Sequence, residues 1–498
     1  MDMNQREDIS QEQFSFGNLK DYSSQDILNL VHKFDFRRIS FRYLGLDGRF
    51  KQLIIPINGL NSQEIEKILV EGERVDGSSL YPGIIDSTYS DILIIPDLST
   101  AFVDPFDERN LSFICRYRKK DGELAPFTLD TILLQAEAQL RKTTGLELWV
   151  GGELEFYLIY DHEDIFYSPE TQKGYHESSP FIKGLDFLKE AAEMIQKITG
   201  AVKYVHSEVG CLPHLESENP FLKGKTLEQL EIEFKTESVV SAADHLVLAR
   251  WILRQLAAQK GMLVTFTPKI AEEVAGNGFH LHLELMREGQ NIMVAPDGKL
   301  TQEALQLIGG LCNSTGFFLA FGNTMAASYY RLVPNQEAPT QLFWSDCNRS
   351  ALIRVPLLNS HSQTSLSKET STRKRGQTVE LRSPDGSALI HPLLATISLA
   401  ALQGLTEKNS LDIASQYYLS QEGASNFPKE KFPLLPSSCG QVARLVQDKR
   451  QWLEKNNVFP AAIVDYIIKL LEGEELEIIT GERGTDLQKV LHRDLHRH

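Results

Sequence analysis

The first quarter of the chain alternates apolar and polar residues in ways that predict a small α+β unit. Residues 23–34 carry apolar side chains at helical spacing behind a serine, a pattern typical of a capped amphipathic helix. Residues 37–57 hold two alternating runs on either side of Leu46-Asp47-Gly48, which predicts a β-hairpin. Other elements expected here are strands at residues 91–97 and 110–118, and loops around Gly72–Gly83 and Pro105.

The rest of the chain mixes long helical patterns with strands. Helices are expected at residues 127–145, in a long segment ending near Gly261, and twice within residues 440–473. Residues 389–405 are apolar but contain Pro392, and they predict a core helix rather than a membrane span. Residues 361–376 are polar and predict a mobile loop. We therefore divide the chain into a polar leader (1–22), an N-terminal domain (23–122) and a larger domain (123–498).

Three predicted strands each carry two functional side chains separated by one leucine. They are Glu153-Leu-Glu155, His280-Leu-His282 and Glu380-Leu-Arg382. Residues i and i+2 of a strand point to the same face, so each pair can reach one cavity while the leucine packs behind it. Polar-out alternation is also the ordinary pattern of a half-buried strand. That interpretation weakens because glutamate, histidine and arginine occupy the polar positions in all three strands.

These residue types are suited to a site for divalent metal and phosphate. Hard cations prefer carboxylate oxygens, and manganese also accepts imidazole. Glu208 and Glu231 are further candidate ligands, although either could be a glutamate on the solvated face of a helix. Arginine binds phosphate and carboxylate through a planar fork. The candidate arginines are Arg331, Arg349, Arg354 and Arg382.

Composition narrows the class of protein. The 498 residues carry a net charge of −16, which argues against nucleic-acid binding. The start of the sequence is polar and acidic, unlike a signal peptide. The five cysteines are scattered and form no CxxC pair, so we expect a reduced, cytoplasmic protein without a disulfide framework. No P-loop or GxGxxG motif is present to cradle phosphates.

Seven motifs in order resemble the glutamine synthetase family over most of the chain. VDGSS (75–79), alone no more than an Asx turn, is similar to the family's N-terminal latch loop. GGELEF, HSEV and EQLE resemble its metal-glutamate segments, and AGNGFHLHLEL resembles its metal-histidine strand. Residues 328–356 resemble its substrate-arginine and flap segment, and VELRSPDG resembles its last metal-glutamate strand.

The resemblance implies an α+β architecture, with a small N-terminal β-grasp domain before a large catalytic domain of antiparallel sheet and flanking helices. It implies an ATP-dependent ligase that phosphorylates the side-chain carboxylate of glutamate and transfers it to ammonia. It also implies two or more Mg2+ or Mn2+ ions per site, no nucleic-acid or membrane partner, and a homo-dodecamer of two hexameric rings.

The resemblance also implies roles for individual residues. One metal would take Glu155, Glu208 and Glu231, and the other Glu153, His280 and Glu380. Arg331, Arg382 and Gly276 would bind the substrate, whereas His282, Arg349 and Arg354 would bind ATP, with Arg349 also catalytic. Glu337 would be the flap acid that closes the site, and Asp76 would come from a neighbouring subunit to assist catalysis.

Four departures from the family pattern leave the acceptor open. Ala275 replaces an asparagine, Glu284 a serine and Thr378 an arginine, and Gly210–Thr226 is an insertion. An insertion whose ends are pinned beside the site could line it or bulge away from it. The alternatives are therefore a γ-glutamyl amide synthetase that uses a bulkier amine, such as a polyamine, ethanolamine or an aromatic amine, and an inactive homologue that binds metal or nucleotide.

Overall fold

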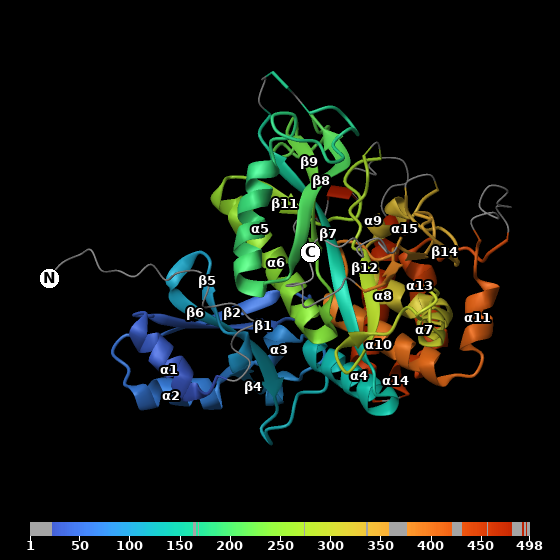
Figure 1. Ribbon diagram of the computed structural model, residues 1–498. Coiled ribbons are helices and arrows are strands. Elements are labelled where there is room, and N and C mark those ends of the chain that lie inside the picture. The colour runs from blue at the N-terminus through green and yellow to red at the C-terminus, as the bar shows by residue number, and fades with distance from the viewer. Residues whose placement is uncertain are drawn as a thin grey trace.

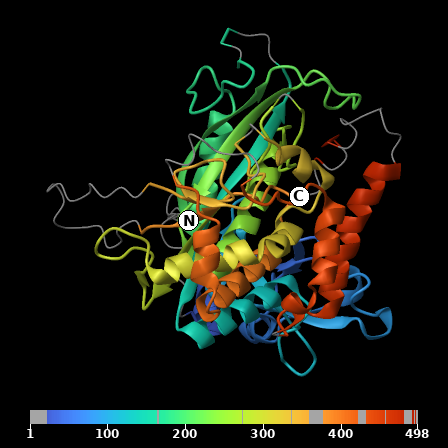
Figure 2. The same cartoon turned by 90° about the vertical axis from the view of Figure 1, so that its right-hand side faces the viewer.

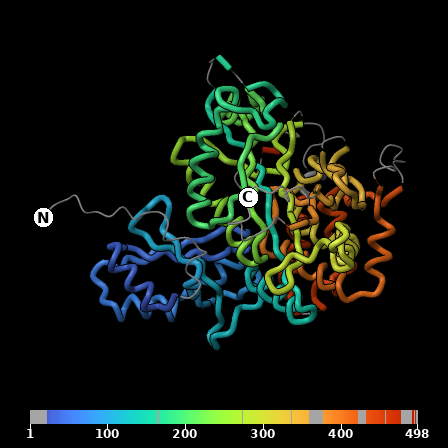
Figure 3. The backbone as a smooth tube through the Cα atoms, in the orientation of Figure 1, coloured from blue at the N-terminus to red at the C-terminus, as the bar shows by residue number. Residues whose placement is uncertain are grey.

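The computed structural model describes residues 22–162, 166–167, 169–272, 274–334, 337–357, 376–420, 431–455, 457–480, 491–492 and 495. The expected mobile loop at residues 361–376 lies outside these ranges except for Gly376, as does the leader except for Tyr22. The chain folds into two sheets, and Figure 3 shows the N-terminal part, in blue, set to one side of the remainder.

The N-terminal domain is a mixed sheet packed against two helices. The sheet order is β2-β1-β6-β4-β3, with β5 added beside β6. The central pair, β1 and β6, is parallel, and the other pairs are antiparallel. The elements are α1 Ser24–Lys33, β1 Arg38–Leu44, β2 Phe50–Pro56, α2 Ser62–Glu71, β3 Glu73–Asp76, α3 Gly77–Leu80, β4 Asp91–Pro96, β5 Phe102–Asp104 and β6 Asp107–Arg118, with 3-10 turns at Ser87–Tyr89 and Leu98–Thr100.

Local sequence explains most of these elements. Ser23 caps α1 in a capping box with Asp26, as its position before the apolar pattern predicts. The hairpin β1–β2 turns at Gly48, which adopts a φ of 72° that favours glycine. The expected loop at Gly72–Gly83 is wrong in part, because residues 73–76 form β3 by pairing with β4. Four residues with three charged side chains give too short an alternation to identify a strand.

The larger domain is built on a ten-stranded sheet of order β14-β15-β16-β12-β7-β9-β8, with β10, β11 and β13 at its margins. All pairs are antiparallel except β14 with β15. Its strands are β7 Glu147–Tyr160, β8 Val202–Leu212, β9 Thr226–Phe234, β10 Glu237–Ser238, β11 Leu263–Thr265, β12 Leu281–Arg287, β13 Gln290–Asn291, β14 Trp344–Asp346, β15 Ile353–Val355 and β16 Val379–Leu381.

Helices cover this sheet from two sides. In Figure 1, α5 and α6 pack against β7 and β8 on the left, whereas α7, α8, α10 and α13 gather on the right. Figure 2 shows the green strands extending above the yellow and orange helices. The helices are α4 Leu129–Thr144, α5 Leu185–Thr199, α6 Val239–Gln259, α7 Gln302–Asn313, α8 Thr315–Gly322, α9 Ala326–Arg331, α10 Ile390–Thr406, α11 Ser410–Gln416, α13 Cys439–Asp448, α14 Gln451–Glu454 and α15 Ala461–Thr480.

The apolar helix expected at residues 389–405 is α10, and most of its side chains are buried in the core. Pro392 lies in its first turn, where a missing backbone N–H costs little. Among the described residues, no single helix is long and apolar enough to cross a membrane. Helices α7 and α8 meet that test only as a pair, which is bent by 71°.

A buried charge network joins the two domains. Arg116 on β6 donates to the carboxylate of Asp244 on α6 at 3.2 Å, and His391 on α10 contacts the same carboxylate at 3.0 Å. Asp130 on α4 lies 3.7 Å from the Arg116 guanidinium. Burial alone would raise the pKa of Asp244, but Arg116 and His391 lower it. The carboxylate is therefore ionised and joins α6 to β6 and α10, while Arg116 extends the network to α4.

Replacing Asp244 with asparagine is expected to lower the free energy of unfolding by about 3–5 kcal/mol, because it removes the nearer counter-charge of the buried Arg116 and leaves only the more distant Asp130. Chemical denaturation of the two proteins measures the difference. Asp107→Asn is the matched control, since the Arg38–Asp107 pair is partly exposed and worth no more than about 1 kcal/mol. Equal losses in the two variants would contradict a structural role for the network.

Candidate active and metal-binding site

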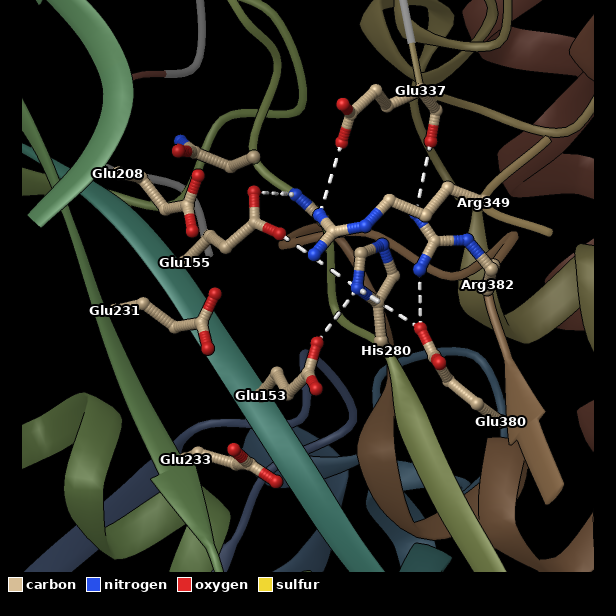
Figure 4. A network of polar contacts seen from close by, with 12 residues as sticks. Glu153, Glu155, Glu208, Glu231, Glu233, His280, Glu337, Arg349, Glu380 and Arg382 are labelled. Carbon is tan, nitrogen blue, oxygen red and sulfur yellow. Dashed lines mark hydrogen bonds and ion pairs between the residues drawn. The ribbon is translucent and has the colours of Figure 1, made fainter. Parts of the chain in front are cut away.

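The predicted pairs converge on one face of the second sheet. On β7, Glu153 and Glu155 lie opposite Glu233 and Glu231 of β9. His282 on β12 lies between β7 and β16, directly opposite Glu380. Glu231 therefore sits on a fully buried strand, not on a solvated helix. Figure 4 shows the glutamate side chains of neighbouring strands turned toward a common centre.

The first ligand group is centred on Glu153. Its two carboxylate oxygens contact the Nδ1 of His280 and the Nε2 of His282, each at 2.7 Å. Ligand atoms of Glu153, His282 and Glu380 lie within 4.8 Å of one another. His280 Nδ1 also lies 3.8 Å from Glu380, so both imidazoles are within reach of this group. Thr378, at the position of the missing arginine, contacts His282 Nδ1 at 3.0 Å and orients the ring.

The second group contains a residue that sequence reasoning missed. His206 lies 3.3 Å from Glu231 and 3.6 Å from Glu208, and ligand atoms of the three residues lie within 4.8 Å of one another. The signal was present, because His206 and Glu208 repeat the i, i+2 spacing on β8. A third group adds Glu233 to Glu153 and Glu231. Glu233 was also missed, and Lys203 pairs with it.

Electrostatics within this site favour a cation. Burial, followed by Glu155 and Glu231, raises the pKa of Glu208 to about 8. Burial, followed by Glu153 and Glu155, raises the pKa of Glu231 well above its usual value. Burial would lower the pKa of His282, but Glu153 and Glu380 raise it to about 9. Without a cation, protons must balance the clustered carboxylates. Oxygen and imidazole donors in this arrangement fit Mg2+ or Mn2+.

The candidate arginines border the carboxylates. Arg354 donates to Glu380 at 2.7 Å, and Arg382 contacts the other oxygen of that carboxylate. Arg331 is buried beside His280, with 3.3 Å between its Nη2 and the imidazole Nε2. The more exposed Arg349 pairs with Glu337 at 3.2 Å. Positive charge is therefore concentrated on the β15–β16 side of the cluster, while β7–β9 carry the negative charge.

Tight backbone packing surrounds the glycine segment beside Glu155 and Arg331. A Cβ on Gly278 would lie 2.8 Å from side-chain atoms of Glu155, His280 and Arg331, so any larger residue there would displace at least one of these side chains. Gly276 packs similarly against Arg331. Gln229, which sequence reasoning did not single out, donates to Glu155 and to the Gly276 carbonyl, each at 3.1 Å. It links the metal-ligand strand to this glycine segment.

Asp76 is not brought to the cluster by its own chain. It caps α3 and accepts hydrogen bonds from Ser78 and Ser79 within its own loop. Hydrogen bonds from Ser79, Ser78 and Ser90 lower its pKa to about 2. None of its hydrogen bonds in the described ranges reaches the carboxylates. Asp76 is an ionised, exposed carboxylate on the N-terminal domain, available to another molecule.

Two aromatic residues missed in the sequence flank the second ligand group. The ring of His176 lies 4.3 Å from that of His206, centroid to centroid, and the ring of Tyr175 lies 4.3 Å from that of His176. Tyr175 also hydrogen-bonds to Arg349. Both residues come from a long connection between β7 and α5, where periodicity gives no positional signal.

The remaining departures have structural explanations. The Ala275 carbonyl accepts a hydrogen bond from the Tyr157 hydroxyl at 2.7 Å. Glu284 is buried, and its carboxylate accepts hydrogen bonds from the Thr236 hydroxyl and the Asn291 amide. Its side chain is therefore engaged with neighbouring residues of the domain. The insertion expected at Gly210–Thr226 begins within β8 and ends at β9. Its Leu215 and Leu222 are buried with Ile270, Ala271 and Val274, so it packs on the segment that leads to Ala275.

Comparisons with known proteins identify the architecture. The family model described as "Glutamine synthetase, catalytic domain" matches residues 131–483, and "Glutamine synthetase, beta-Grasp domain" matches residues 35–120. The glutamine synthetase of Aquifex aeolicus is 28% identical over 94% of this chain and 98% of its own. That of Pyrococcus horikoshii is 31% identical over 74% of each chain.

Solved structures share the fold. A cryo-EM structure of Plasmodium falciparum glutamine synthetase has a TM-score of 0.75 and 20% identity, covering 94% of this chain and 97% of its own. A ligand-free structure of GmaS has a TM-score of 0.73 and 19% identity, covering 94% and 100%. Both sheets and the helices around them therefore correspond to a known two-domain arrangement.

Proposed function

The chain belongs to the glutamine synthetase family of ATP-dependent ligases, and from this premise we propose that it joins ammonia to the side-chain carboxylate of glutamate. The observation that carries the proposal is the convergence of three overlapping ligand groups, two of carboxylates with an imidazole and one of carboxylates alone, with arginines along one edge. Such a site matches a reaction in which phosphate charge must be held and neutralised.

We assign the metal ligands in two sets. One set is Glu155, Glu208 and Glu231, and the other is Glu153, His280 and Glu380. The proximity of His206 and His282 adds an imidazole beside each set. Bound Mg2+ or Mn2+ would supply charge neutralisation at the transferring phosphoryl group. The β7–β9 and β8–β9 ladders fix the strands that carry Glu153, Glu155, Glu208 and Glu231. These carboxylates therefore determine where a bound cation would lie.

The arginines divide the anionic groups between them. In this proposal Arg331, Arg382 and the Gly276 segment bind glutamate, whereas Arg349, Arg354 and His282 face the ATP phosphates. Arg331 and Arg382 are buried, and both donate hydrogen bonds to backbone carbonyls. Their positions are therefore fixed before a substrate binds, which suits them to orient it. Arg349 is freer to adjust to a ligand, because it is half exposed and paired at its tip with Glu337.

The chemistry follows from the weakness of a carboxylate as an acylating agent. ATP transfers its γ-phosphoryl group to the glutamate side chain, and ammonia displaces phosphate from the resulting acyl phosphate. Glu337, an exposed residue at a φ of 50°, is assigned as the flap acid that closes over the intermediate and keeps water out. Asp76 of a neighbouring subunit, ionised at neutral pH, is assigned to attract the ammonium ion.

Ammonia is our preferred acceptor because the surroundings of Glu208 suit a small cation. His206 lies 3.6 Å from this carboxylate, and the rings of His176 and Tyr175 follow it in tilted contacts, so the carboxylate is bordered by π-faces. The curated relatives at 28–31% identity are glutamine synthetases. Ala275 and the insertion favour the alternative, a γ-glutamyl amide, and a fold like that of GmaS, a gamma-glutamylmethylamide synthetase, is compatible with it.

An inactive homologue is the second alternative. It is disfavoured by the cluster itself, since burying Glu155, Glu231 and Glu380 beside the partly buried Glu153 is costly, and a site without turnover has no need to hold so many carboxylates together. A chain released from catalysis would gain stability by losing some of these charges.

A phosphate-release assay with ATP, Mg2+, glutamate and a panel of amines tests the proposal. The panel contains ammonium, methylamine, ethanolamine, putrescine and aniline, and mass spectrometry identifies each amide. We expect the highest kcat/KM for ammonium, by at least about tenfold, a margin of about 1.4 kcal/mol in transition-state binding. A larger amine with the highest kcat/KM would establish the γ-glutamyl amide alternative. If no amine of the panel supports phosphate release, the inactive homologue is favoured.

Donation of Asp76 in trans, within a dodecamer of two hexameric rings, predicts complementation between two inactive variants. Asp76→Asn and Glu153→Gln subunits are expected to be nearly inactive alone. Co-assembled, they should recover activity, because some sites then combine an intact Asp76 from one subunit with an intact Glu153 from another. Light scattering should show the ring assembly. A fully active monomer, or mixed rings without recovery, would contradict this arrangement.

A further inference from the structure

A cavity of about 310 Å3 lies between the two domains, away from the carboxylate cluster. One wall is the turn of the β1–β2 hairpin, including Arg49 and Phe50, and the other is α6. From α6, Val247, Arg250, Trp251 and Arg254 face the space. The volume is at the lower end of the range for small-molecule sites. Three of the lining side chains, those of Arg49, Arg250 and Arg254, end in guanidinium groups.

Two of these guanidinium groups carry buried N–H donors without a hydrogen-bond partner. Arg250 donates from Nη1 to the Ala388 carbonyl at 3.0 Å, but its Nε and Nη2 are buried without a hydrogen-bond partner. The Nε and Nη2 of Arg254 are also buried and unpartnered. Both groups stack over Phe266, at 5.4 and 4.8 Å from the ring centroid. Within the described part of the chain, no carboxylate forms an ion pair with either arginine.

The surroundings disfavour these positive charges. Burial lowers the pKa of Arg254 to about 9, and repulsion from Arg250 and Arg49 adds to the effect. Burial lowers the pKa of Arg250 to about 10, partly opposed by Asp385. The one acid on the cavity wall, Asp47, already accepts hydrogen bonds from Arg49 at 3.0 Å and Lys51 at 2.7 Å. Three arginines thus face a space that offers them no free anion.

We propose that this cavity binds a small dianion, whose carboxylate or phosphate groups pair with Arg250 and Arg254 while Arg49 closes the rim. A planar guanidinium with free Nε and Nη2 presents the two-donor edge that binds such an anion in bidentate fashion. Phe50, Val247 and Trp251 form an apolar wall for a short hydrocarbon body. Buried charges of one sign are costly unless a partner neutralises them. The inference does not depend on the proposed reaction.

The cavity lies behind the candidate active site rather than within it. Arg250 also stacks on Phe279, 5.4 Å from the ring centroid, and Phe279 immediately precedes His280. Because one wall belongs to each domain, a bound dianion would favour their docked arrangement. Binding should therefore be visible as a gain in thermal stability of the full-length protein.

Calorimetric titration with succinate and, separately, with inorganic phosphate tests the proposal, with melting curves recorded at matched ionic strength in chloride. We expect saturable binding of at least one anion and a rise of a few degrees in melting temperature. Arg254→Met should weaken this binding at least about tenfold. In chloride alone the variant should melt no lower than the wild type, because a buried unpaired charge has been replaced by an apolar chain. The two anions distinguish a carboxylate site from a phosphate site.

Arg49→Gln, at the cavity rim, provides a second variant that does not disturb the core, and Arg287→Gln, in an exposed pair with Glu303, is the control that should bind like the wild type. Anion binding at the arginines of the candidate active site should be the same in the wild type and the three variants. It therefore cancels when their affinities and numbers of sites are compared. Equal affinity and equal numbers of sites in the wild type, Arg254→Met and Arg49→Gln would overturn the proposal, as would no saturable binding of either anion.

Discussion

Replacing Glu153 with glutamine is expected to lower turnover by at least roughly 10²- to 10³-fold while leaving the protein folded. Glu153 belongs to two of the three ligand groups, and its two oxygens contact both imidazoles of the site. Glutamine preserves the shape of the side chain but removes the charge that these contacts and a divalent cation require. The effect should appear in kcat, because the lost interaction is with the transferring phosphoryl group.

Steady-state phosphate release by purified Glu153→Gln protein measures this effect. Glu147→Gln is a suitable control, because Glu147 lies on the same strand but is more exposed and pairs with Arg141. The control should retain activity near that of the wild type. Near-normal turnover by Glu153→Gln, in a protein whose melting curve matches the wild type, would remove Glu153 from the metal site.

Removal of divalent metal is expected to destabilise the protein, and more strongly as the pH rises. In the folded, metal-free chain the pKa of Glu208 is raised from its usual value of 4.5 to about 8. Between these two pH values the folded state holds a proton that the unfolded state releases, so stability falls as the pH increases. The loss amounts to about 1.4 kcal/mol for each pH unit crossed in this window. Metal binding reverses the loss by replacing the proton.

Melting temperatures at pH 6.0 and pH 8.5, with either a chelator or excess Mn2+, measure this linkage. We expect the gain from Mn2+ to be several degrees and larger at the higher pH, with proton release when metal is added to a weakly buffered sample. Glu208→Gln removes one of the titrating carboxyls and should reduce the pH dependence of the metal-free protein, whereas the raised pKa of Glu231 leaves part of it in place. A gain from Mn2+ that is the same at both pH values would contradict the role of Glu208.

Periodicity alone located much of the fold and part of the site. The alternation around Glu153 and Glu155 correctly indicated side chains on one face, and the register of β7 with β9 extends the same rule to Glu231 and Glu233. Capping and hairpin signals identified α1 and the β1–β2 pair. The predicted resemblance to the glutamine synthetase family, with its two-domain α+β fold, is confirmed.

What the sequence did not indicate depends on contacts between distant segments. His206 with Glu208, and Glu231 with Glu233, share the i, i+2 spacing, but that signal gains its meaning only from ligand atoms on other strands, which the local sequence does not show. Tyr175 and His176 reach the site from a connection without periodicity. The strand β3 is defined by its pairing with β4 rather than by its composition. The unpaired arginines of α6 are visible only once the core around Phe266 is assembled.

The central claim is that the glutamate side chain is phosphorylated before the amine attacks. Glutamate labelled with 18O in its side-chain carboxylate tests it most directly, when incubated with ATP, Mg2+ and ammonium. Phosphorylation of the carboxylate predicts that one of its two labelled oxygens leaves with each inorganic phosphate. The other labelled oxygen should remain as the carbonyl oxygen of the amide product. Mass spectrometry of the released phosphate measures the transfer. Amide formation with unlabelled phosphate would contradict the account.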